Sequence, residues 1–140
     1  MEKTIRFSIS LESELSRKFD SWMKKNSYKN RSEAVRDLIR DKLVEEEWKD
    51  DSKEVVAVLS LVYSHDSPEL PRVLTDIQHQ HHSLVISSTH IHLDKHNCLE
   101  VIIMKGQAGV IKKVASELLS LRRVKHGRLM MTTTGADIPS

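Results

Sequence analysis

The sequence predicts an α+β protein built of two units, and two patterns carry this prediction. A strand with strict alternation precedes two helical patterns near the amino terminus, in the order β-α-α. The later part runs strand, helix, strand, strand, helix, strand, which is the split β-α-β order of a ferredoxin-like or ACT-type domain. We therefore expect an amino-terminal unit at residues 1–47, a linker at residues 48–54 and a second domain at residues 55–135.

Length and composition fit a protein without membrane or disulfide-dependent parts. A chain of 140 residues has room for one ordinary domain or two small ones. No apolar run approaches the roughly 20 residues of a membrane span, and the amino terminus lacks the layout of a secretory signal. The single cysteine cannot form an internal disulfide, which suits a reducing compartment and leaves its thiolate free as a ligand. We expect a cytoplasmic protein.

The amino-terminal strand lacks a partner within its own unit. Residues 4–10 alternate, with Ile5, Phe7 and Ile9 on one side. One strand and two helices in about 45 residues cannot bury a core, and an unpaired strand is a liability. Both deficits disappear if two copies pair these strands antiparallel and interlock their helices. The unit is therefore expected to be an obligate dimer.

Two helices follow this strand. The first has an apolar face at Leu15, Phe19, Trp22 and Met23. Asn30 is the expected N-cap of the second helix, with Glu33 three residues later. That helix carries apolar residues at Ala34, Val35, Leu38, Ile39 and Leu43. Trp48 interrupts the polar run 45–53, and we expect it to dock on a neighbouring surface.

The second domain is expected to place two helices on one face of a four-stranded antiparallel sheet. The predicted strands are residues 55–63, 84–93, 98–106 and 124–134, and the predicted helices are residues 69–82 and 109–122. Pro71 is tolerable in the first turn of a helix. The other face of the sheet remains free for a partner.

The paired amino-terminal strands would form a ribbon that fits the major groove of DNA. In such a ribbon Arg6, Ser8 and Ser10 face outward, where arginine can donate two hydrogen bonds to guanine and short hydroxyls can contact base edges. A phosphate could bind at the start of the second helix. The candidate phosphate contacts are Asn30, Arg31, Ser32 and Arg36. An ordinary solvated strand face also favours serine and arginine, so that alternative stays open.

Charge is divided unevenly along the chain, whose net charge is +2. Residues 1–43 hold eleven Lys or Arg against seven Asp or Glu, whereas residues 44–140 hold eleven against thirteen. The positive end therefore coincides with the predicted ribbon, as in a nucleic-acid-binding arm. Basic residues spread over a helix are also common on a solvated face.

Histidines gather near the only cysteine. His90 and His92 are two apart on a strand, so both rings leave one face of the sheet about 7 Å apart. A five-residue connection LDKHN would place Cys98 opposite His92 and on that same face, whereas a four-residue connection DKHN would place it on the other face. A metal site therefore requires Cys98 to lie opposite His92 or to be turned by a bulge. The fourth ligand is expected from the QHQHH stretch. If His90 and His92 lie on the face without helices, a helix histidine of the same chain would reach the metal with difficulty, and another subunit is the natural source. A histidine-rich surface without a metal is the alternative.

The expected donors do not select one metal. A thiolate with three imidazoles is borderline-soft and suits Zn, Cu, Ni or Co. A tetrahedral arrangement would favour Zn, and a square-planar one Cu(II) or Ni(II). The residues alone leave this choice open.

The amino-terminal 45 residues resemble a ribbon-helix-helix DNA-binding domain, and the whole chain resembles the nickel-responsive ribbon-helix-helix repressors, the NikR family. The matching pieces are YKNRSEAVRDLIR, VLSLVYSHD, QHQHH, STHIHLDKHNCLEV and VKHG. The resemblance implies one Ni(II) per subunit, bound in a plane by His79 of one subunit and by His90, His92 and Cys98 of its neighbour.

Other residues acquire roles only through this resemblance. Gln78 and Glu100 match positions that support the ligands, and Glu33 and Asp37 match a second cation site, where an i, i+4 spacing places both on one helix face. The resemblance assigns no settled role to the histidines and tyrosine that remain near the site. These are Tyr63, His65, His81, His82 and His96.

The resemblance implies a homotetramer, a dimer of dimers that binds double-stranded operator DNA and represses nickel uptake when nickel is bound. Metal and DNA would each raise the affinity for the other. One alternative is a ribbon-helix-helix regulator that senses Co, Cu, Zn or a small molecule such as an amino acid. An antitoxin is disfavoured because the rest of the chain has the pattern of a folded domain. A zinc hydrolase is disfavoured because four protein ligands leave no open coordination position, so we expect no enzyme.

Overall fold

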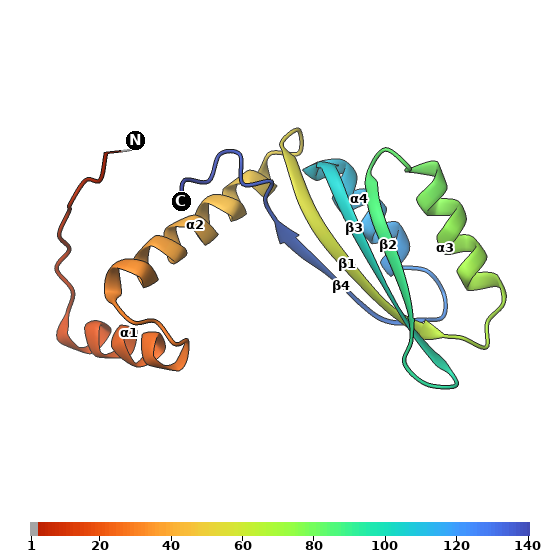
Figure 1. The fold of residues 1–140 in the computed structure, drawn as a ribbon, viewed down its shortest axis with the longest axis horizontal. Coiled ribbons are helices and arrows are strands. Elements are labelled where there is room, and N and C mark those ends of the chain that lie inside the picture. The colour runs from red at the N-terminus through yellow and green to blue at the C-terminus, as the bar shows by residue number, and fades with distance from the viewer. Residues whose placement is uncertain (1–2) are drawn as a thin grey trace. The chain divides into compact units, whose positions relative to one another are not determined.

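The computed structural model describes residues 3–140 and forms two compact units that divide between Asp41 and Lys42. Figure 1 shows the course of the chain. The amino-terminal unit was expected to start at residue 1, and its first two residues lie outside the described part. Helix α2 (Arg31–Lys49) includes Trp48 and Lys49, so the helix continues past the residue where the linker was expected to begin.

The first unit consists of an extended segment, residues 3–12, and the helices α1 (Ser13–Lys25) and α2. The N-cap prediction is confirmed, because the side-chain oxygen of Asn30 accepts a hydrogen bond from the backbone N–H of Glu33 at 2.9 Å. Residues 3–12 form neither a helix nor a strand in the single chain. Ile5 and Phe7 are 81% and 72% exposed. The predicted strand requires a second copy, so it stays a prediction.

Two polar contacts and an aromatic stack hold the first unit together. The ring of Trp22 stacks on Phe19 and on Tyr28, with centroid distances of 5.9 and 5.3 Å. Arg31 makes a two-pronged ion pair with Asp20, with nitrogen–oxygen distances of 2.9 and 2.7 Å. The turn between α1 and α2 is therefore fixed by contacts on both of its sides.

The second unit is a four-stranded antiparallel sheet with two helices. Its strands and helices are β1 (Glu54–Ser64), α3 (Glu69–Gln80), β2 (Val85–His92), β3 (Asn97–Gln107), α4 (Ala108–Leu119) and β4 (Val124–Thr132). The strands lie side by side in the order β2-β3-β1-β4 (Figure 1). The predicted β-α-β-β-α-β order is confirmed, and the α+β architecture is consistent with a ferredoxin-like or ACT-type domain.

The core lies between one face of the sheet and the two helices. Alternate residues of β1 are buried from Val55 to Tyr63. Leu74 of α3 and Leu118 of α4 are also fully buried, in the same hydrophobic cluster. Gly127 of β4 allows close packing, because a Cβ there would lie only 2.3 Å from a methyl group of Leu119.

Trp48, which belongs to the second unit, packs into the core of that unit, and the prediction that it docks on a neighbouring surface is confirmed. It is 5% exposed, and its indole N–H donates to the carbonyl oxygen of Thr132 at 2.8 Å. No helix among residues 3–140 is long and apolar enough to cross a membrane.

The opposite face of the sheet remains partly open. Val58 pairs with Ile103 on β3 and with Met130 on β4, and Ile91 pairs with Leu99. Met130 is 55% exposed, and Ile91 is 41% exposed. Apolar side chains therefore continue across this face without a cover in the single chain.

Candidate metal centre

The hairpin of β2 and β3 sets the register of the site. His92 lies opposite Cys98, and His90 lies opposite Glu100. Residues directly opposite each other in an antiparallel pair share a face of the sheet. The predicted register across the five-residue LDKHN connection is therefore confirmed.

These histidines do not lie on the uncovered face, which was the condition for expecting a ligand from another subunit. Cys98 and Glu100 are buried on the face that the helices cover, together with Ile102 farther along β3. Since His90 and His92 lie opposite Glu100 and Cys98, their rings leave the sheet on the helix-covered side. An uncovered face therefore cannot be the reason why a fourth ligand comes from another subunit.

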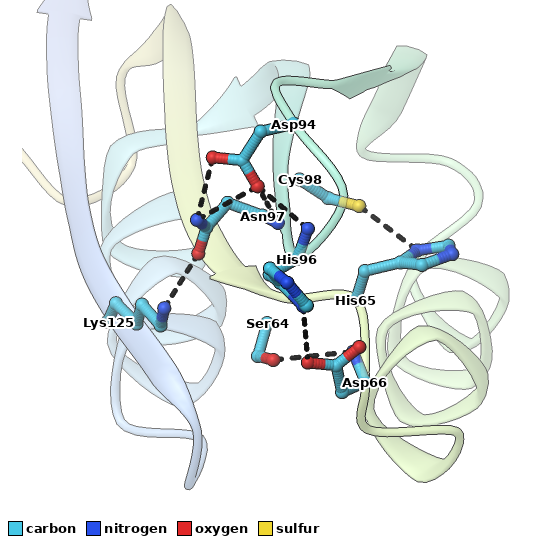
Figure 2. Close-up of polar contacts among 8 residues, drawn as sticks. All are labelled: Ser64, His65, Asp66, Asp94, His96, Asn97, Cys98 and Lys125. Carbon is cyan, nitrogen blue, oxygen red and sulfur yellow. Dashed lines mark hydrogen bonds and ion pairs between the residues drawn. The ribbon is translucent and has the colours of Figure 1, made fainter.

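Four potential ligands meet at one end of this face. One donor atom from each of His65, His90, His92 and Cys98 lies within 4.8 Å of the others. The Cys98 sulfur is 3.3 Å from Nδ1 of His65 and 3.7 Å from Nδ1 of His92. Figure 2 shows the sulfur directed toward the His65 ring. Cys98 is buried and the three histidines are exposed, so the cluster opens to solvent on the imidazole side.

The chemistry of this donor set fits a borderline transition metal. One sulfur and three imidazole nitrogens suit Ni, Zn, Co or Cu rather than Mg or Ca. Burial raises the pKa of the Cys98 thiol, and the nearby carboxylates of Asp94 and Glu100 raise it further. A metal bound here must therefore displace the thiol proton.

The buried carboxylate of Glu100 is linked to His90 through Tyr63. Glu100 accepts hydrogen bonds from the Tyr63 hydroxyl at 3.2 Å, from Nε2 of Gln78 at 2.8 Å and from Oγ of Ser88 at 2.9 Å. The Tyr63 oxygen is also 3.0 Å from Nδ1 of His90. Because Tyr63 donates its only proton to Glu100, Nδ1 of His90 must be the donor in that contact. Nε2 of His90 then remains free for a metal.

This network keeps Tyr63 neutral. Burial strongly raises the pKa of its hydroxyl, and the charge of Glu100 adds to the effect. Gln78 and Glu100, expected to support the ligands, contact each other here. The sequence analysis left Tyr63 without a role and did not single out Ser88. The alternation of residues 55–63 could have placed Tyr63 on the buried face of its strand.

The structure brings His65 to the cluster, whereas His79 does not belong to it. His79 is exposed near the end of α3. His65 follows directly after β1, and its backbone N–H donates to the carbonyl of His96 in the hairpin turn. Its position in VLSLVYSHD, one of the pieces that resemble the NikR family, was the sequence signal for it.

Several residues expected at DNA or at a second cation already have partners in the single chain. The Arg31 hydrogen bonds lower the pKa of Asp20, and the same contact raises the pKa of Arg31. Nε of Arg36 donates to the carbonyl of Ser32 at 3.2 Å. The Asp37 carboxylate accepts from the Tyr28 hydroxyl and from Arg40, both at 2.9 Å.

The other expected DNA contacts lie in exposed positions. They are Arg6, Ser8 and Ser10 in the extended segment, and Asn30 and Ser32 at the start of α2. Glu33 is also exposed, one helical turn before Asp37.

Comparisons with known proteins match both parts of the chain. The family model described as the NikR C-terminal nickel-binding domain matches residues 56–132. A protein of Pyrococcus furiosus is 52% identical over 134 residues, which cover 96% of this chain and 97% of the relative. A protein of Nitratidesulfovibrio vulgaris strain Miyazaki F is 48% identical over 138 residues, 99% of each chain. Each bears the name "Putative nickel-responsive regulator".

A likeness to a solved structure is weaker. An uncharacterized protein of Thermotoga maritima covers 58% of this chain and 98% of its own, with a TM-score of 0.46 and 12% identity. That similarity adds nothing to the assignment. The family model and the relatives decide it: the chain belongs to the family of nickel-responsive regulators that carry the NikR C-terminal nickel-binding domain.

Proposed function

We propose that this protein is a nickel-dependent transcriptional repressor that binds operator DNA more tightly when Ni(II) is bound. The observation that carries the proposal is the convergence of one thiol and three imidazoles within 4.8 Å in a domain of this family. Ni(II) supplies a charged centre that ties these side chains together. The relatives are named as regulators, and no reaction is proposed.

His90, His92 and Cys98 would supply three of the four ligands for one Ni(II) per subunit. We assign the fourth position to His79 of a neighbouring subunit, which rests on the family resemblance and on the exposure of His79. His65 is the competing fourth ligand, because it already lies 3.3 Å from the sulfur. Gln78 and Glu100 would hold the ligands in place through the carboxylate network.

The amino-terminal unit, residues 1–47, is proposed to bind DNA as a ribbon-helix-helix dimer. The exposed apolar row Ile5, Phe7 and Ile9 supports pairing with a second copy, since single chains rarely leave such a row in water. Pairing would turn the other side of the ribbon toward the major groove. The proposed base contacts are Arg6, Ser8 and Ser10, and the proposed phosphate contacts are Asn30, Arg31, Ser32 and Arg36.

The second domain, residues 55–135, is proposed to hold four subunits together. Its open apolar face offers a surface for a second copy. A metal that bridges subunits inside a tetramer would favour one arrangement of the two ribbons, so nickel and DNA would each raise the affinity for the other. Residues 48–54 would be the linker between the DNA-binding unit and the metal-binding domain.

A second cation site at Glu33 and Asp37 remains part of the proposal. A cation there would compete with Arg40, which already contributes a positive charge to the Asp37 carboxylate. The site would therefore require Arg40 to turn toward another acceptor, such as DNA phosphate.

Sensing of Zn or Co is the second candidate function. The observation in its favour is that one chain alone supplies four donors, with His65 as the fourth. Such a set has no need of a neighbouring subunit, and Zn prefers a tetrahedral set of four nitrogen and sulfur ligands.

Nickel titration of the purified protein tests the proposal. We expect a thiolate–Ni(II) charge-transfer absorption that is lost in Cys98→Ala, and operator binding that strengthens with nickel. His79→Ala should abolish the nickel band, whereas His65→Ala should retain it. The reverse result would move the fourth ligand to His65, and operator binding indifferent to nickel would overturn the proposed function.

A further inference from the structure

The turn between β2 and β3 is organised by one carboxylate. Oδ1 of Asp94 accepts the backbone N–H groups of His96 at 2.7 Å and of Asn97 at 2.8 Å. Its Oδ2 accepts from Nδ2 of Asn97 at 2.9 Å. Aspartate commonly fixes a turn by bonding to the backbone two residues later, and here it also holds the next residue and its amide. These hydrogen bonds of Asp94 all lie within residues 94–97.

The same turn is tied to its surroundings on two sides (Figure 2). Nδ1 of His96 lies 3.1 Å from the Asp66 carboxylate, and the carbonyl of His96 accepts the backbone N–H of His65. Oδ1 of Asn97 accepts from Nζ of Lys125 at 2.6 Å. The turn therefore fixes the segment that carries His65, and Lys125 at the start of β4 holds the turn in place.

Three of the four clustered donors depend on this turn for their positions. His92 is the last residue of β2, two residues before Asp94, and Cys98 lies four residues after it on β3. His65 is attached through the backbone of His96. A turn that loosens would let the sulfur and the two rings shift relative to one another, because His92 and Cys98 are the strand residues that flank it and His65 bonds to its backbone.

We propose that Asp94 is a positioning residue of the metal centre, which holds the turn so that Cys98, His92 and His65 keep their mutual distances before a metal arrives. The inference rests on the proposed function, since it concerns the same site. An aspartate that merely stabilises a surface turn would affect folding but not the metal. Removal of a positioning residue should change the affinity for nickel and the spectrum of bound nickel, whereas removal of a residue that only stabilises the turn should change neither.

The test is a nickel titration of the 140-residue protein with a competing chelator, read by affinity and by the thiolate–Ni(II) absorption band. Residues that orient metal ligands commonly change affinity by about 10–100-fold when they are removed. We expect Asp94→Ala to lose affinity in that range and to shift the band. Asp94→Asn keeps one acceptor oxygen for the backbone N–H groups, so it should lose less.

Asp76→Ala is the matched control. Asp76 is an exposed aspartate of α3 whose ion pair with Arg72 is 4.0 Å long, so its removal should change neither affinity nor band. Circular dichroism of each variant reports whether the fold is retained. If Asp94→Ala does not fold, Asp94→Asn alone decides the question.

The outcomes separate this inference from the proposed function. Wild-type protein without a thiolate-dependent band would refute the proposed function itself. A wild-type band together with folded Asp94 variants of unchanged affinity and spectrum would overturn the positioning role alone. Weaker affinity with a shifted band, in the Asp94 variants and not in the control, supports it.

Discussion

Tyr63 joins His90, one of the proposed metal ligands, to the buried Glu100 carboxylate through a single hydroxyl group. Tyr63→Phe keeps the ring in the core but removes the contacts to Glu100 and to Nδ1 of His90. Glu100 keeps two other donors, so we expect a loss of about 1–2 kcal/mol in the free energy of unfolding. The free imidazole can then rotate or change tautomer, and nickel affinity should fall about tenfold or more.

A second tyrosine supplies the control for this prediction. Tyr28 donates its hydroxyl proton to Asp37 in the first unit and is not a member of the cluster. Tyr28→Phe removes a similar hydrogen bond and should leave nickel affinity unchanged. Urea denaturation gives the stability of both variants, and chelator competition gives the affinity. Equal nickel affinity in Tyr63→Phe and wild type would mean that the hydroxyl does not orient His90.

Cys98 makes nickel binding sensitive to pH. Burial keeps the pKa of this thiol above its ordinary value of about 8.5, so the metal-free protein holds the proton at neutral pH. Nickel must release about one proton from Cys98, and affinity should therefore fall as the pH falls. Calorimetry in two buffers of different ionisation enthalpy measures the released protons.

Comparison with Cys98→Ser shows how many of the protons released on nickel binding come from the thiol. A serine hydroxyl does not ionise in this range, so the variant should release about one proton fewer at whatever affinity remains. The raised pKa also acts on folding of the metal-free protein. Stabilisation from the neutral buried thiol is present below the pKa of the unfolded chain and is lost as the pH rises through the higher folded value.

At the scale of single elements, the positive charge of Arg31 at the start of α2 is already paired with a carboxylate of the same chain. Asp20 on α1 holds Arg31, one of the proposed phosphate contacts, in a two-pronged ion pair. Asp20→Asn would remove the competing negative charge and free the guanidinium for DNA. We expect tighter operator binding and a salt dependence that is steeper by about one unit in the log–log slope.

Arg31→Ala provides the opposite change in the same contact. It should weaken binding across different DNA sequences and make the salt slope shallower by about one. Binding at several salt concentrations, measured by fluorescence anisotropy, gives both slopes. If Asp20→Asn alters stability but not the slope, Arg31 serves only to join α1 to α2.

The sequence predicts the strands of the second domain well but not the face of the hairpin. Each predicted strand lies within two residues of its observed bounds, because β1 and β3 alternate between buried and exposed residues. Strand β2 is an edge strand with almost no buried residue, so its alternation carries little information. The register also shifts between Val85 and Ser87. Counting alternate residues from the apolar start of β2 therefore does not show on which face of the sheet His90 and His92 lie.

The site was predictable in part for a similar reason. Counting residues left two connections open, LDKHN and DKHN, and only the first places His92 opposite Cys98. The structure has that pairing, which the metal site required. His65 lies beyond the end of β1, where strand alternation no longer applies. Its approach to the sulfur depends on a backbone contact with the hairpin turn, which no local pattern encodes.

At the scale of the whole molecule, each unit exposes an apolar surface of its own. The first is the row Ile5, Phe7 and Ile9, and the second is the open sheet face around Met130 and Ile91. Two separate apolar surfaces predict two kinds of subunit contact. In the proposed tetramer the sheet faces form the centre and the paired ribbons bind DNA.

Substitutions on the two surfaces should therefore have different effects on assembly. Phe7→Glu places a charge in the proposed ribbon core, so DNA binding should be lost while the central tetramer and its nickel remain. Val101→Glu places a charge on the open sheet face beside Ser60, and it should reduce the tetramer to ribbon-linked dimers. Light scattering gives the mass of each species, and chelator competition gives its nickel affinity.

Nickel binding in the Val101→Glu dimer then separates the two candidate fourth ligands. If His79 of a neighbouring subunit completes the site, dissociation at the sheet face removes that ligand, and affinity should fall by at least tenfold with loss of the nickel band. If His65 completes it, all four donors stay in one chain within 4.8 Å, and the dimer should bind as tightly as the tetramer. A nickel band that survives dissociation would therefore mean that each subunit holds a complete metal site. The proposed coupling of nickel to DNA binding would then lack its metal bridge between subunits.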